Sequence, residues 1–314
     1  WVAYVSTYPP RECGIATFTE DLTHAMDKRF NPALRSKIVA VNDNGSSTYN
    51  YDKNKVKNHI DESDVEAYID AAKFINRNDK IKMVNLQHEF GIFGGNYGEY
   101  IIPFLEALEK PIVTTFHSVL ANPEERRKKV VQAIVKRSQA VVVMTNAAVD
   151  ILVRDYEISR KKIRVIPHGV PSIPFGKIEE SKKMLGLDGK IVLSTFGLIN
   201  SGKGIEYVIE ALPAIIEKHP NLLYLVIGET HPQVRKHEGE EYRNKLRNLV
   251  EKLGLKDNVK FYNKYLPTSE IVKYLSATDI YVFATQDPNQ ISSGTLAYAV
   301  GGGKAIVATP CVYA

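Results

Sequence analysis

The sequence alternates short apolar segments with amphipathic helical segments, and this pattern constrains the fold more than any other feature. Apolar residues at helical spacing lie between strand-like segments, for example Val65, Tyr68, Ile69 and Ala72. In the first half, the segments typical of buried strands are Val2–Ser6, Lys37–Val41, Met83–Leu86, Ile112–Phe116, Ala140–Met144 and Ile163–Ile166. Apolar strands separated by helices are typical of parallel sheets covered on both faces. The sequence therefore predicts an α/β, doubly wound, Rossmann-like fold.

The same alternation begins again in the second half. Residues 168–176 contain two Pro and two Gly, which is typical of a linker. The strands expected after it are Lys190–Phe196, Leu222–Ile227, Val259–Tyr262, Ile280–Ala284 and Lys304–Ala308. We therefore expect two domains, residues 1–170 and 171–314. In such a pair the carboxyl ends of both sets of strands face a shared cleft, where ligand binds.

Two local patterns in the first half lead to more detailed expectations. Phe18, Leu22, Ala25 and Met26 recur at helical spacing, so we expect one helix with these residues on its apolar face. Residues 44–59 are polar and rich in turn formers, which predicts a surface loop.

Composition excludes several classes of protein. Hydrophobic residues make up 44% and charged residues 25%, which are globular values. The apolar runs are strand-sized, far short of the roughly 20 residues that span a bilayer. Two cysteines, Cys13 and Cys311, are too few for a disulfide framework or a four-thiolate metal site.

Without a secretory signal before the first strand, the expected location is the cytoplasm. Because the sequence lacks an initial Met and stops just after a strand-like segment, we expect a truncated chain with an incomplete second domain.

The net charge is +5, and the first half has two basic clusters: Arg126–Lys129 with Lys136 and Arg137, and Arg160–Lys162 with Arg164. A solvated surface is one explanation. The alternative is a surface that attracts an anionic substrate or anionic lipid, which would place the protein at the inner face of a membrane. Neither cluster interleaves aromatic residues as a single-strand nucleic-acid groove does, so no nucleic-acid partner is expected.

The segment Gly197–Gly204 is the strongest candidate for an anion-binding site. It follows an expected strand and opens an amphipathic helix, and it contains Gly202 and Lys203. Glycines let the backbone approach an anion, the helix start offers N–H groups, and Lys203 adds a charge. Gly204 stands where a nucleoside-triphosphate loop needs Ser or Thr for magnesium. Phosphate binding without magnesium-dependent hydrolysis is therefore the functional prediction, and a glycine turn with a solvated Lys is the alternative.

Two further turns supply candidate phosphate contacts. Gly14 joins the first strand to the first helix. Ser292, Ser293, Gly294 and Thr295 precede or open a helix in the second half, where hydroxyl and backbone donors can meet an anion. Helix capping alone explains the second group equally well.

Histidines complete the set of candidates. His117 directly follows the strand Ile112–Phe116, and His88 follows Met83–Leu86. Ligands bind at the carboxyl ends of strands in such sheets, although a single His is more often structural. His168 lies at the linker. No Asp-any-Asp pair follows a strand, so no metal-bound diphosphate is indicated.

Together these residues resemble the family 4 glycosyltransferases, which have the GT-B fold, along nearly the whole chain. Pro9–Gly14 is similar to the family's N-terminal glycine loop, and Thr115-Phe116-His117 to its donor-sugar histidine. Gly197–Gly204 resembles the diphosphate turn, and Gly228-Glu229 the next nucleotide-facing turn. Gln290–Pro310 resembles the signature region.

Three positions differ from the family pattern. Leu198 stands where the family usually has an Arg that partners the Lys. Gln290 and Tyr298 take the places of the two signature Glu residues, the second of which ordinarily holds the ribose hydroxyls. Gln290 keeps hydrogen-bonding capacity but carries no charge.

The resemblance implies retaining transfer of a hexose from a nucleotide diphosphate sugar, without metal or cofactor, to a sugar, lipid-linked or small-molecule acceptor in carbohydrate metabolism. It implies catalytic roles for His117, Gln290 and Lys203. The resemblance also implies two sets of donor contacts. Those to the diphosphate come from Gly14, Gly202, Lys203, Ser292, Ser293, Gly294 and Thr295, and those to the nucleoside from Gly228, Glu229 and Tyr298. A non-catalytic sugar-nucleotide-binding module and a sugar phosphorylase on the same fold are the alternatives.

Overall fold

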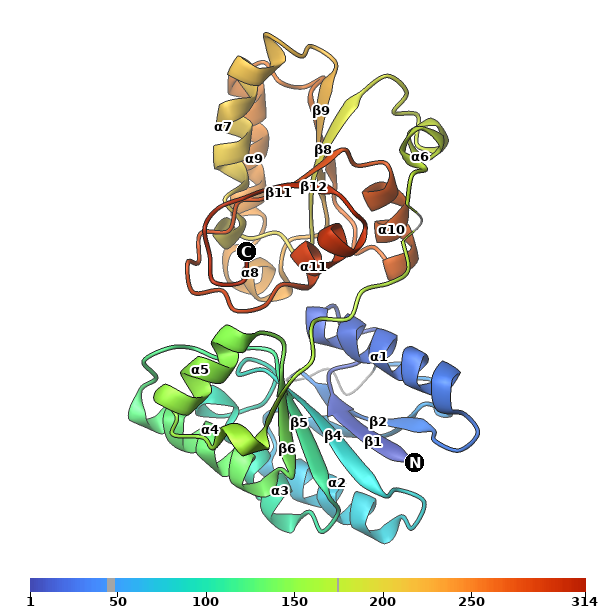
Figure 1. The fold of residues 1–314 in the computed structure, drawn as a ribbon, viewed down its shortest axis with the longest axis vertical. Coiled ribbons are helices and arrows are strands. Elements are labelled where there is room, and N and C mark those ends of the chain that lie inside the picture. Colours follow the sequence, from blue (N-terminus) through green and yellow to red (C-terminus); the bar gives the residue numbers. More distant parts are fainter. Residues whose placement is uncertain (44–48, 174) are drawn as a thin grey trace. The chain divides into compact units, whose positions relative to one another are not determined.

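The chain divides into two structural units, Trp1–Gly169 (unit 1) and Val170–Ala314 (unit 2). The computed structural model describes residues 1–43, 49–173 and 175–314 (Figure 1). The division lies one residue before the predicted domain boundary. Each unit has its own parallel sheet, and the two are described separately.

Unit 1 contains a seven-stranded parallel sheet in the order β3-β2-β1-β4-β5-β6-β7. Its strands are β1 Val2–Ser6, β2 Ser36–Asn42, β3 Val56–Asp61, β4 Met83–His88, β5 Ile112–Phe116, β6 Ala140–Val143 and β7 Ile163–Val165. Its α-helices are α1 Gly14–Phe30, α2 Val65–Arg77, α3 Ile101–Ala107, α4 Glu125–Arg137 and α5 Asn146–Arg154, with short 3₁₀ turns η1 Asn96–Gly98 and η2 Arg160–Lys162. The strand order reverses between β1 and β4.

Unit 2 contains a five-stranded parallel sheet in the order β10-β9-β8-β11-β12. Its strands are β8 Ile191–Phe196, β9 Leu222–Ile227, β10 Val259–Tyr262, β11 Ile280–Phe283 and β12 Ala305–Ala308. Its helices are α6 Ile178–Met184, η3 Ser201–Lys203, α7 Ile205–Ile216, α8 Pro232–Glu238, α9 Glu241–Lys252, α10 Thr268–Ser276 and α11 Gly294–Gly301. The prediction of an α/β fold with two parallel, Rossmann-like sheets is confirmed.

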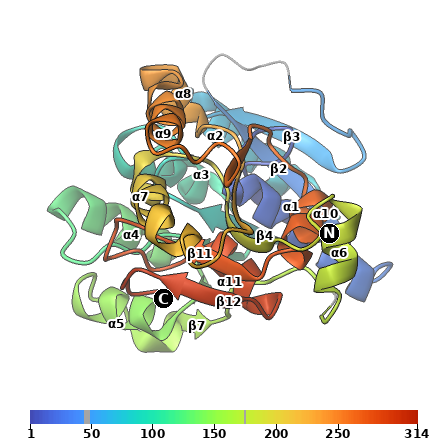
Figure 2. The same cartoon turned by 90° about the horizontal axis from the view of Figure 1, so that it is seen from above.

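Strand β9 shows why unit 2 has helices on both faces of its sheet. All six of its residues are buried, and successive side chains point to opposite faces. Leu222, Tyr224 and Val226 pack in one core cluster with α7 and α9. Leu223, Leu225 and Ile227 pack in a second cluster with α10 and α11. Figure 2 shows α7 and α9 on one side of this sheet and α6 and α10 on the other.

Helix α1 forms as expected, but its buried face differs from the predicted one. The buried residues are Ala16, Thr19 and Thr23, whereas Ala25 is exposed. Thr19 is tolerated because its hydroxyl shares a hydrogen bond with the Ser6 hydroxyl at 2.7 Å. The small Ala and Thr side chains let α1 pack close to β1. The spacing of large apolar residues does not predict a buried face of this kind.

The predicted loop over residues 44–59 is wrong at its carboxyl end. Strand β3 begins at Val56 and pairs in parallel with β2. As an edge strand it buries only Val56 and Ile60, so its sequence is largely polar. Residues 44–48 of the predicted loop lie outside the described residues.

The strand β4 extends beyond the predicted Met83–Leu86, and His88 is its last residue. The His88 side chain is fully buried. Its ring stacks on Phe93 at 5.7 Å and contacts Phe90 and Phe116 edge-on. Within the described part of the chain, neither ring nitrogen has a hydrogen-bond partner. Burial lowers the pKa of His88 to about 3, so the folded protein holds this ring neutral.

Replacing His88 is expected to reduce the acid sensitivity of unit 1. The unfolded chain takes up this proton below about pH 6.5 and the folded chain only near pH 3, so the folded state loses stability as pH falls between them. Between about pH 6 and 4 the unfolding free energy of both proteins falls as pH falls. We expect the slope for His88→Phe to be smaller than the wild-type slope by about 1.4 kcal/mol per pH unit. Urea unfolding followed by the fluorescence of Trp1, the single Trp of the sequence, measures unit 1. Parallel pH profiles for the two proteins would contradict the assignment.

Candidate functional site

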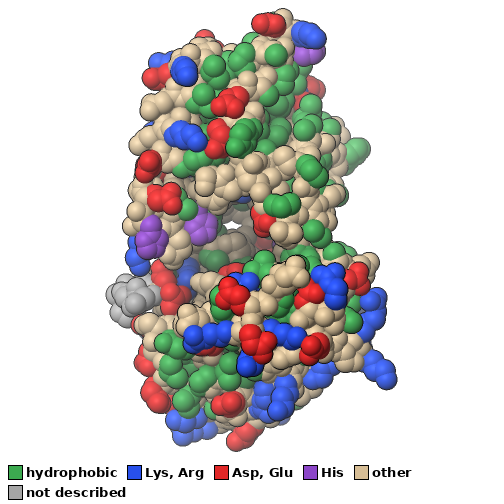
Figure 3. Space-filling model, turned by 90° about the vertical axis from the view of Figure 1, so that its left-hand side faces the viewer, with side chains coloured by type: hydrophobic (Ala, Val, Ile, Leu, Met, Phe, Trp, Pro, Cys, Tyr) green, Lys and Arg blue, Asp and Glu red, His purple; other side chains and the backbone are tan. Residues whose placement is uncertain are grey.

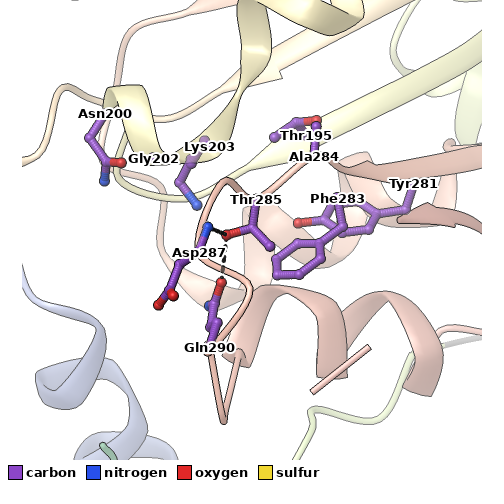
Figure 4. Close-up of a pocket in the computed structure, with 10 residues that line it drawn as sticks. All are labelled: Thr195, Asn200, Gly202, Lys203, Tyr281, Phe283, Ala284, Thr285, Asp287 and Gln290. Carbon is purple, nitrogen blue, oxygen red and sulfur yellow. Dashed lines mark hydrogen bonds between the residues drawn. The ribbon is translucent and has the colours of Figure 1, made fainter. Parts of the chain in front are cut away.

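The candidate site in unit 2 is a cavity of about 220 Å³ at the carboxyl ends of β8 and β11. These strands are neighbours in the sheet although strands β9 and β10 and helices α7 to α10 lie between them in the sequence, so the strand order reverses here. Ligands bind at such reversal points in parallel sheets. The lining residues are Thr195, Asn200, Gly202, Lys203, Tyr281, Phe283, Ala284, Thr285, Asp287 and Gln290 (Figure 4).

Lys203 brings a positive charge into this cavity. It ends the turn η3 between β8 and α7, and its side chain points toward the loop that carries Thr285 and Gln290 (Figure 4). Burial lowers the pKa of Lys203 to about 8. Among the described residues, no carboxylate forms an ion pair with it. A desolvated ammonium without a protein counter-ion is suited to bind an anion.

Gln290 lines the cavity, and its side-chain amide is engaged within its own loop. The Thr285 hydroxyl donates to Gln290 Oε1 at 2.8 Å, and Gln290 Nε2 donates to the Ser292 carbonyl at 3.1 Å. The backbone N–H of Gln286 donates to the Gly202 carbonyl at 2.8 Å. These bonds fix the 285–290 loop against the turn that carries Lys203. A catalytic role for Gln290 stays a prediction.

The turns after β8 and β9 meet backbone to backbone at Gly197 and Gly228. Both have positive φ, 118° and 132°, and a Cβ on Gly228 would lie 2.0 Å from the Gly197 carbonyl oxygen. Next to this contact, the Ile199 N–H donates to the Glu229 carbonyl at 2.7 Å. The His231 N–H donates to the Ile199 carbonyl at 2.9 Å. Only glycine permits this approach, which joins the Lys203 loop to the Gly228-Glu229 turn.

Arg243 on α9 supports the Gly228-Glu229 turn from below. Its guanidinium is buried, donating from Nη2 to the Gly228 carbonyl at 2.7 Å and from Nε to the Thr230 hydroxyl at 3.2 Å. Glu229 Oε2 lies 3.5 Å from Arg235 Nη1. Arg243 thus contacts the backbone of the turn and Arg235 its carboxylate, and the nucleoside-side role of Gly228 and Glu229 stays a prediction.

The predicted group Ser292, Ser293, Gly294 and Thr295 lies at the start of α11. Ser293 is the N-cap of this helix, because its Oγ accepts from the Leu296 N–H at 3.2 Å. A Cβ on Gly197 would lie 3.1 Å from Thr295 Cγ2, so Thr295 is next to the glycine turn. None of the four lines the cavity.

Tyr298 lies in the core cluster on the α10 and α11 face rather than at the cavity. It is buried, and its ring centroid is 6.3 Å from that of Phe196. The structure therefore brings Gly202, Lys203 and Gln290 together at the cavity and places Tyr298 behind them. A ribose contact by Tyr298 stays a prediction.

In unit 1, His117 directly follows β5 and is buried. Its Nε2 is 2.8 Å from Gln87 Oε1 on β4, and its ring meets Phe18 of α1 edge-on at 4.7 Å. Phe18 also contacts His168 at 5.1 Å. Burial, followed by the nearby His168 and His88, lowers the pKa of His117 to about 3. At neutral pH the ring is uncharged and acts through hydrogen bonds.

Gly14 is the first residue of α1, next to the N-cap Cys13. It is exposed, and a Cβ placed on it would meet no atom within 4 Å. Local packing therefore does not require glycine here, and its predicted phosphate contact stays a prediction.

The two basic clusters of unit 1 are largely paired with acidic residues or with backbone carbonyls. Arg126 forms a bidentate ion pair with Glu99, in which Nη2 lies 2.7 Å from Oε1. Lys128 Nζ lies 2.7 Å from Glu157 Oε1. Lys162 donates to the Val135 carbonyl at 2.9 Å. Figure 3 shows Lys and Arg interspersed with Asp and Glu on this face of unit 1. The pairing supports the solvated-surface explanation, and anionic membrane contact stays a prediction.

Sequence reasoning missed several side chains of these sites. Thr285 and Asp287 follow the expected strand Ile280–Ala284, so their place at a carboxyl end was the available signal. Gln87 lies inside a strand, where a polar residue between Leu86 and His88 was a weaker signal. The contribution of Phe18 comes from tertiary packing and has no local signal.

Comparison with known families identifies glycosyltransferases in both units. Residues 69–172 match the family described as "Glycosyltransferase Family 4", and residues 177–289 match "Glycosyl transferases group 1". Among the described residues, no helix has the length and apolar character to cross a bilayer.

Curated relatives match parts of the chain. Mannosylfructose-phosphate synthase of Agrobacterium fabrum is 26% identical over 162 residues, 49% of this chain and 35% of that protein. D-inositol 3-phosphate glycosyltransferase of Segniliparus rotundus is 26% identical over 189 residues, 56% of this chain and 40% of that protein. The matches thus span less than half the length of these relatives.

Solved structures share the fold over nearly the whole chain. A glycosyltransferase from Rickettsia africae has a TM-score of 0.73 at 18% identity, covering 100% of this chain and 80% of that one. HepE of Anabaena, in complex with UDP and glucose, has a TM-score of 0.71 at 14% identity, covering 99% and 81%. These neighbours have the GT-B architecture that the sequence predicted.

A methyl group on Gly228 is expected to disrupt the joined turns of unit 2. Gly228→Ala places Cβ against the Gly197 carbonyl, so we expect a loss of unfolding free energy of about 3 kcal/mol or more. Gly254→Ala is the matched control, because Gly254, just after α9, also has positive φ but open space around it, and we expect a loss of about 1 kcal/mol. Circular dichroism follows both units, and Trp1 fluorescence follows unit 1 alone. Equal losses in the two variants would refute the backbone contact.

Proposed function

Because the chain belongs to the family 4 glycosyltransferases, we propose that it transfers a hexose from a nucleoside diphosphate sugar to a sugar, lipid-linked or small-molecule acceptor, with retention of configuration. The observation that carries this proposal is the Lys203 ammonium in the cavity at the ends of β8 and β11. A diphosphate is the leaving group of such a transfer, and it carries the charge that this cation complements.

The chemistry assigned to unit 2 is stabilisation of the departing diphosphate. As the bond between the sugar and the diphosphate breaks, negative charge grows on the phosphoryl oxygens. Lys203 offers a cation there, at the end of the η3 turn and next to the start of α7, where the helix dipole is positive. In a site of low dielectric such fixed donors stabilise the transition state strongly. We therefore propose that this side chain and the backbone do the work that a metal ion does in other transferases.

The chemistry assigned to unit 1 is contact with the transferred sugar through His117. Its neutral ring forms hydrogen bonds without adding a positive charge next to the anomeric centre. HepE, which shares the fold, was solved with UDP and glucose and with UDP-glucose. UDP-sugars are therefore the first donors to test, followed by GDP- and ADP-sugars.

A non-catalytic sugar-nucleotide-binding module is the second candidate. It is favoured by the Gln290 amide, which is engaged with Thr285 and Ser292, and by the position of Tyr298 in the core. Turnover with any acceptor, abolished by Lys203→Ala, would exclude it.

Removal of the Lys203 charge is expected to weaken donor binding. We expect UDP-, GDP- or ADP-sugars to raise the melting temperature of the wild-type protein, and Lys203→Ala to remove most of that increase. The exposed Lys218, near the other end of α7, provides the control variant Lys218→Ala, which should respond like the wild type. If none of these donors stabilises the wild-type protein, donor binding is refuted.

The affinity for a nucleoside diphosphate is expected to fall as pH rises through about 8. The pKa of Lys203 is lowered to about 8 in the unliganded protein, so above that pH the cation must be protonated before the diphosphate binds. We expect the Kd for UDP, measured by calorimetry from pH 7 to 9.5, to rise by up to about tenfold per pH unit above pH 8. A Kd that stays constant up to pH 9.5 would show that the Lys203 charge does not contribute.

A further inference from the structure

A line of polar side chains, half-buried at Asn85 and buried at Gln87, leads to His117 across the sheet of unit 1. Asn85 and Gln87 alternate along β4 and so lie on one face, and the sheet register pairs Gln87 with Thr115 of β5. His117 follows Thr115 by two residues. Gln87 is 0% exposed and His117 is 7% exposed. Polar groups this deeply buried require defined hydrogen-bond partners.

The orientation of the Gln87 amide follows from its neighbours. Its Nε2 donates to Asn85 Oδ1 and lies 3.5 Å from the Thr115 hydroxyl oxygen. With the amide nitrogen on the side of Asn85 and Thr115, the Gln87 oxygen Oε1 faces His117 Nε2, at 2.8 Å. A carbonyl oxygen only accepts, so the ring nitrogen must donate.

We propose that Gln87 is a positioning residue that holds His117 in the neutral tautomer with the proton on Nε2. Nδ1 is then the acceptor nitrogen of the ring. Phe18, packed edge-on against the ring at 4.7 Å, restrains its rotation. The Asn85–Gln87–His117 chain thus sets both the orientation of the ring and the position of its proton.

This tautomer determines which chemical groups of a donor His117 can meet, an inference that rests on the proposed transfer reaction. Nδ1 as an acceptor matches a sugar hydroxyl, which can donate. It does not match a phosphoryl oxygen, which only accepts. This tautomer therefore matches the sugar contact proposed above for His117.

The test is NMR of the unliganded protein with ¹⁵N-labelled histidine rings at pH 7.5, with the His117 signals assigned through His117→Gln. In the wild type we expect the ring proton on Nε2 and slow exchange of that proton with water. In Gln87→Met we expect the Nε2 proton to exchange at least about tenfold faster, because its acceptor is gone. In Gln87→Glu we expect the Nε2 proton to remain and the pKa of His117 to rise, because a carboxylate stabilises the imidazolium against burial and, secondarily, against His168 and His88.

Thr114→Val is the matched control. It removes the buried hydrogen bond between Thr114 and Ser138 at 2.8 Å, in the same sheet but on the face opposite Thr115 and Gln87. We expect it to leave the His117 signals unchanged, which separates loss of stability from loss of positioning. A wild-type proton on Nδ1, or an unchanged Nε2 proton in Gln87→Met, would overturn the proposal.

The two proposals fail in different ways. The NMR measurement needs no donor, so a proton on Nε2 together with no response to any nucleotide sugar would refute only the proposed reaction. A response to a nucleotide sugar with the proton on Nδ1 would refute only the role of Gln87.

Discussion

The backbone contact between Gly197 and Gly228 is the constraint on which the cavity of unit 2 depends. It brings the ends of β8 and β9 so close that a single Cβ would lie 2.0 Å from a carbonyl oxygen. Just after this contact, backbone hydrogen bonds of Ile199 with Glu229 and His231 hold the two turns together. The chain then enters η3, which ends at Lys203. The position of the cation is thus set by backbone geometry. Side-chain packing then completes the support, mainly through Arg243 beneath the Gly228 turn.

Charge is distributed very differently at the two candidate sites. Lys203 is desolvated without a carboxylate partner among the described residues, so no ion pair there neutralises its charge. His117 is desolvated as well, but its neutral form is favoured, and its hydrogen bond to Gln87 satisfies a buried donor. Burial therefore has a different effect on each residue. It strengthens the electrostatic interactions of the Lys203 ammonium, and it favours the uncharged form of the His117 ring.

The sequence was sufficient for the features that follow from periodicity and strand ends. Apolar strands such as Leu222–Ile227 and the glycine turn before Lys203 are local signals, and both appear where they were expected. Strand β3 was missed because an edge strand buries only two of its side chains. The buried face of α1 was missed because Thr19 is satisfied by Ser6, a residue 13 positions away. The role of Gln87 depends on register between β4 and β5, which no single segment encodes.

Gln290 shows why a difference from a family pattern cannot be interpreted from charge alone. A carboxylate at this position would accept hydrogen bonds from both oxygens. The amide instead accepts from Thr285 and donates to the Ser292 carbonyl, so it closes the loop that lines the cavity. A carboxylate in the same orientation would set an oxygen against that carbonyl, and the loop would lose one bond and gain a repulsion. The uncharged residue is therefore matched to the local conformation of this loop, and the loop in turn is bound to Gly202 through Gln286. The uncharged Gln290 and the Lys203 turn are consequently parts of one hydrogen-bonded arrangement.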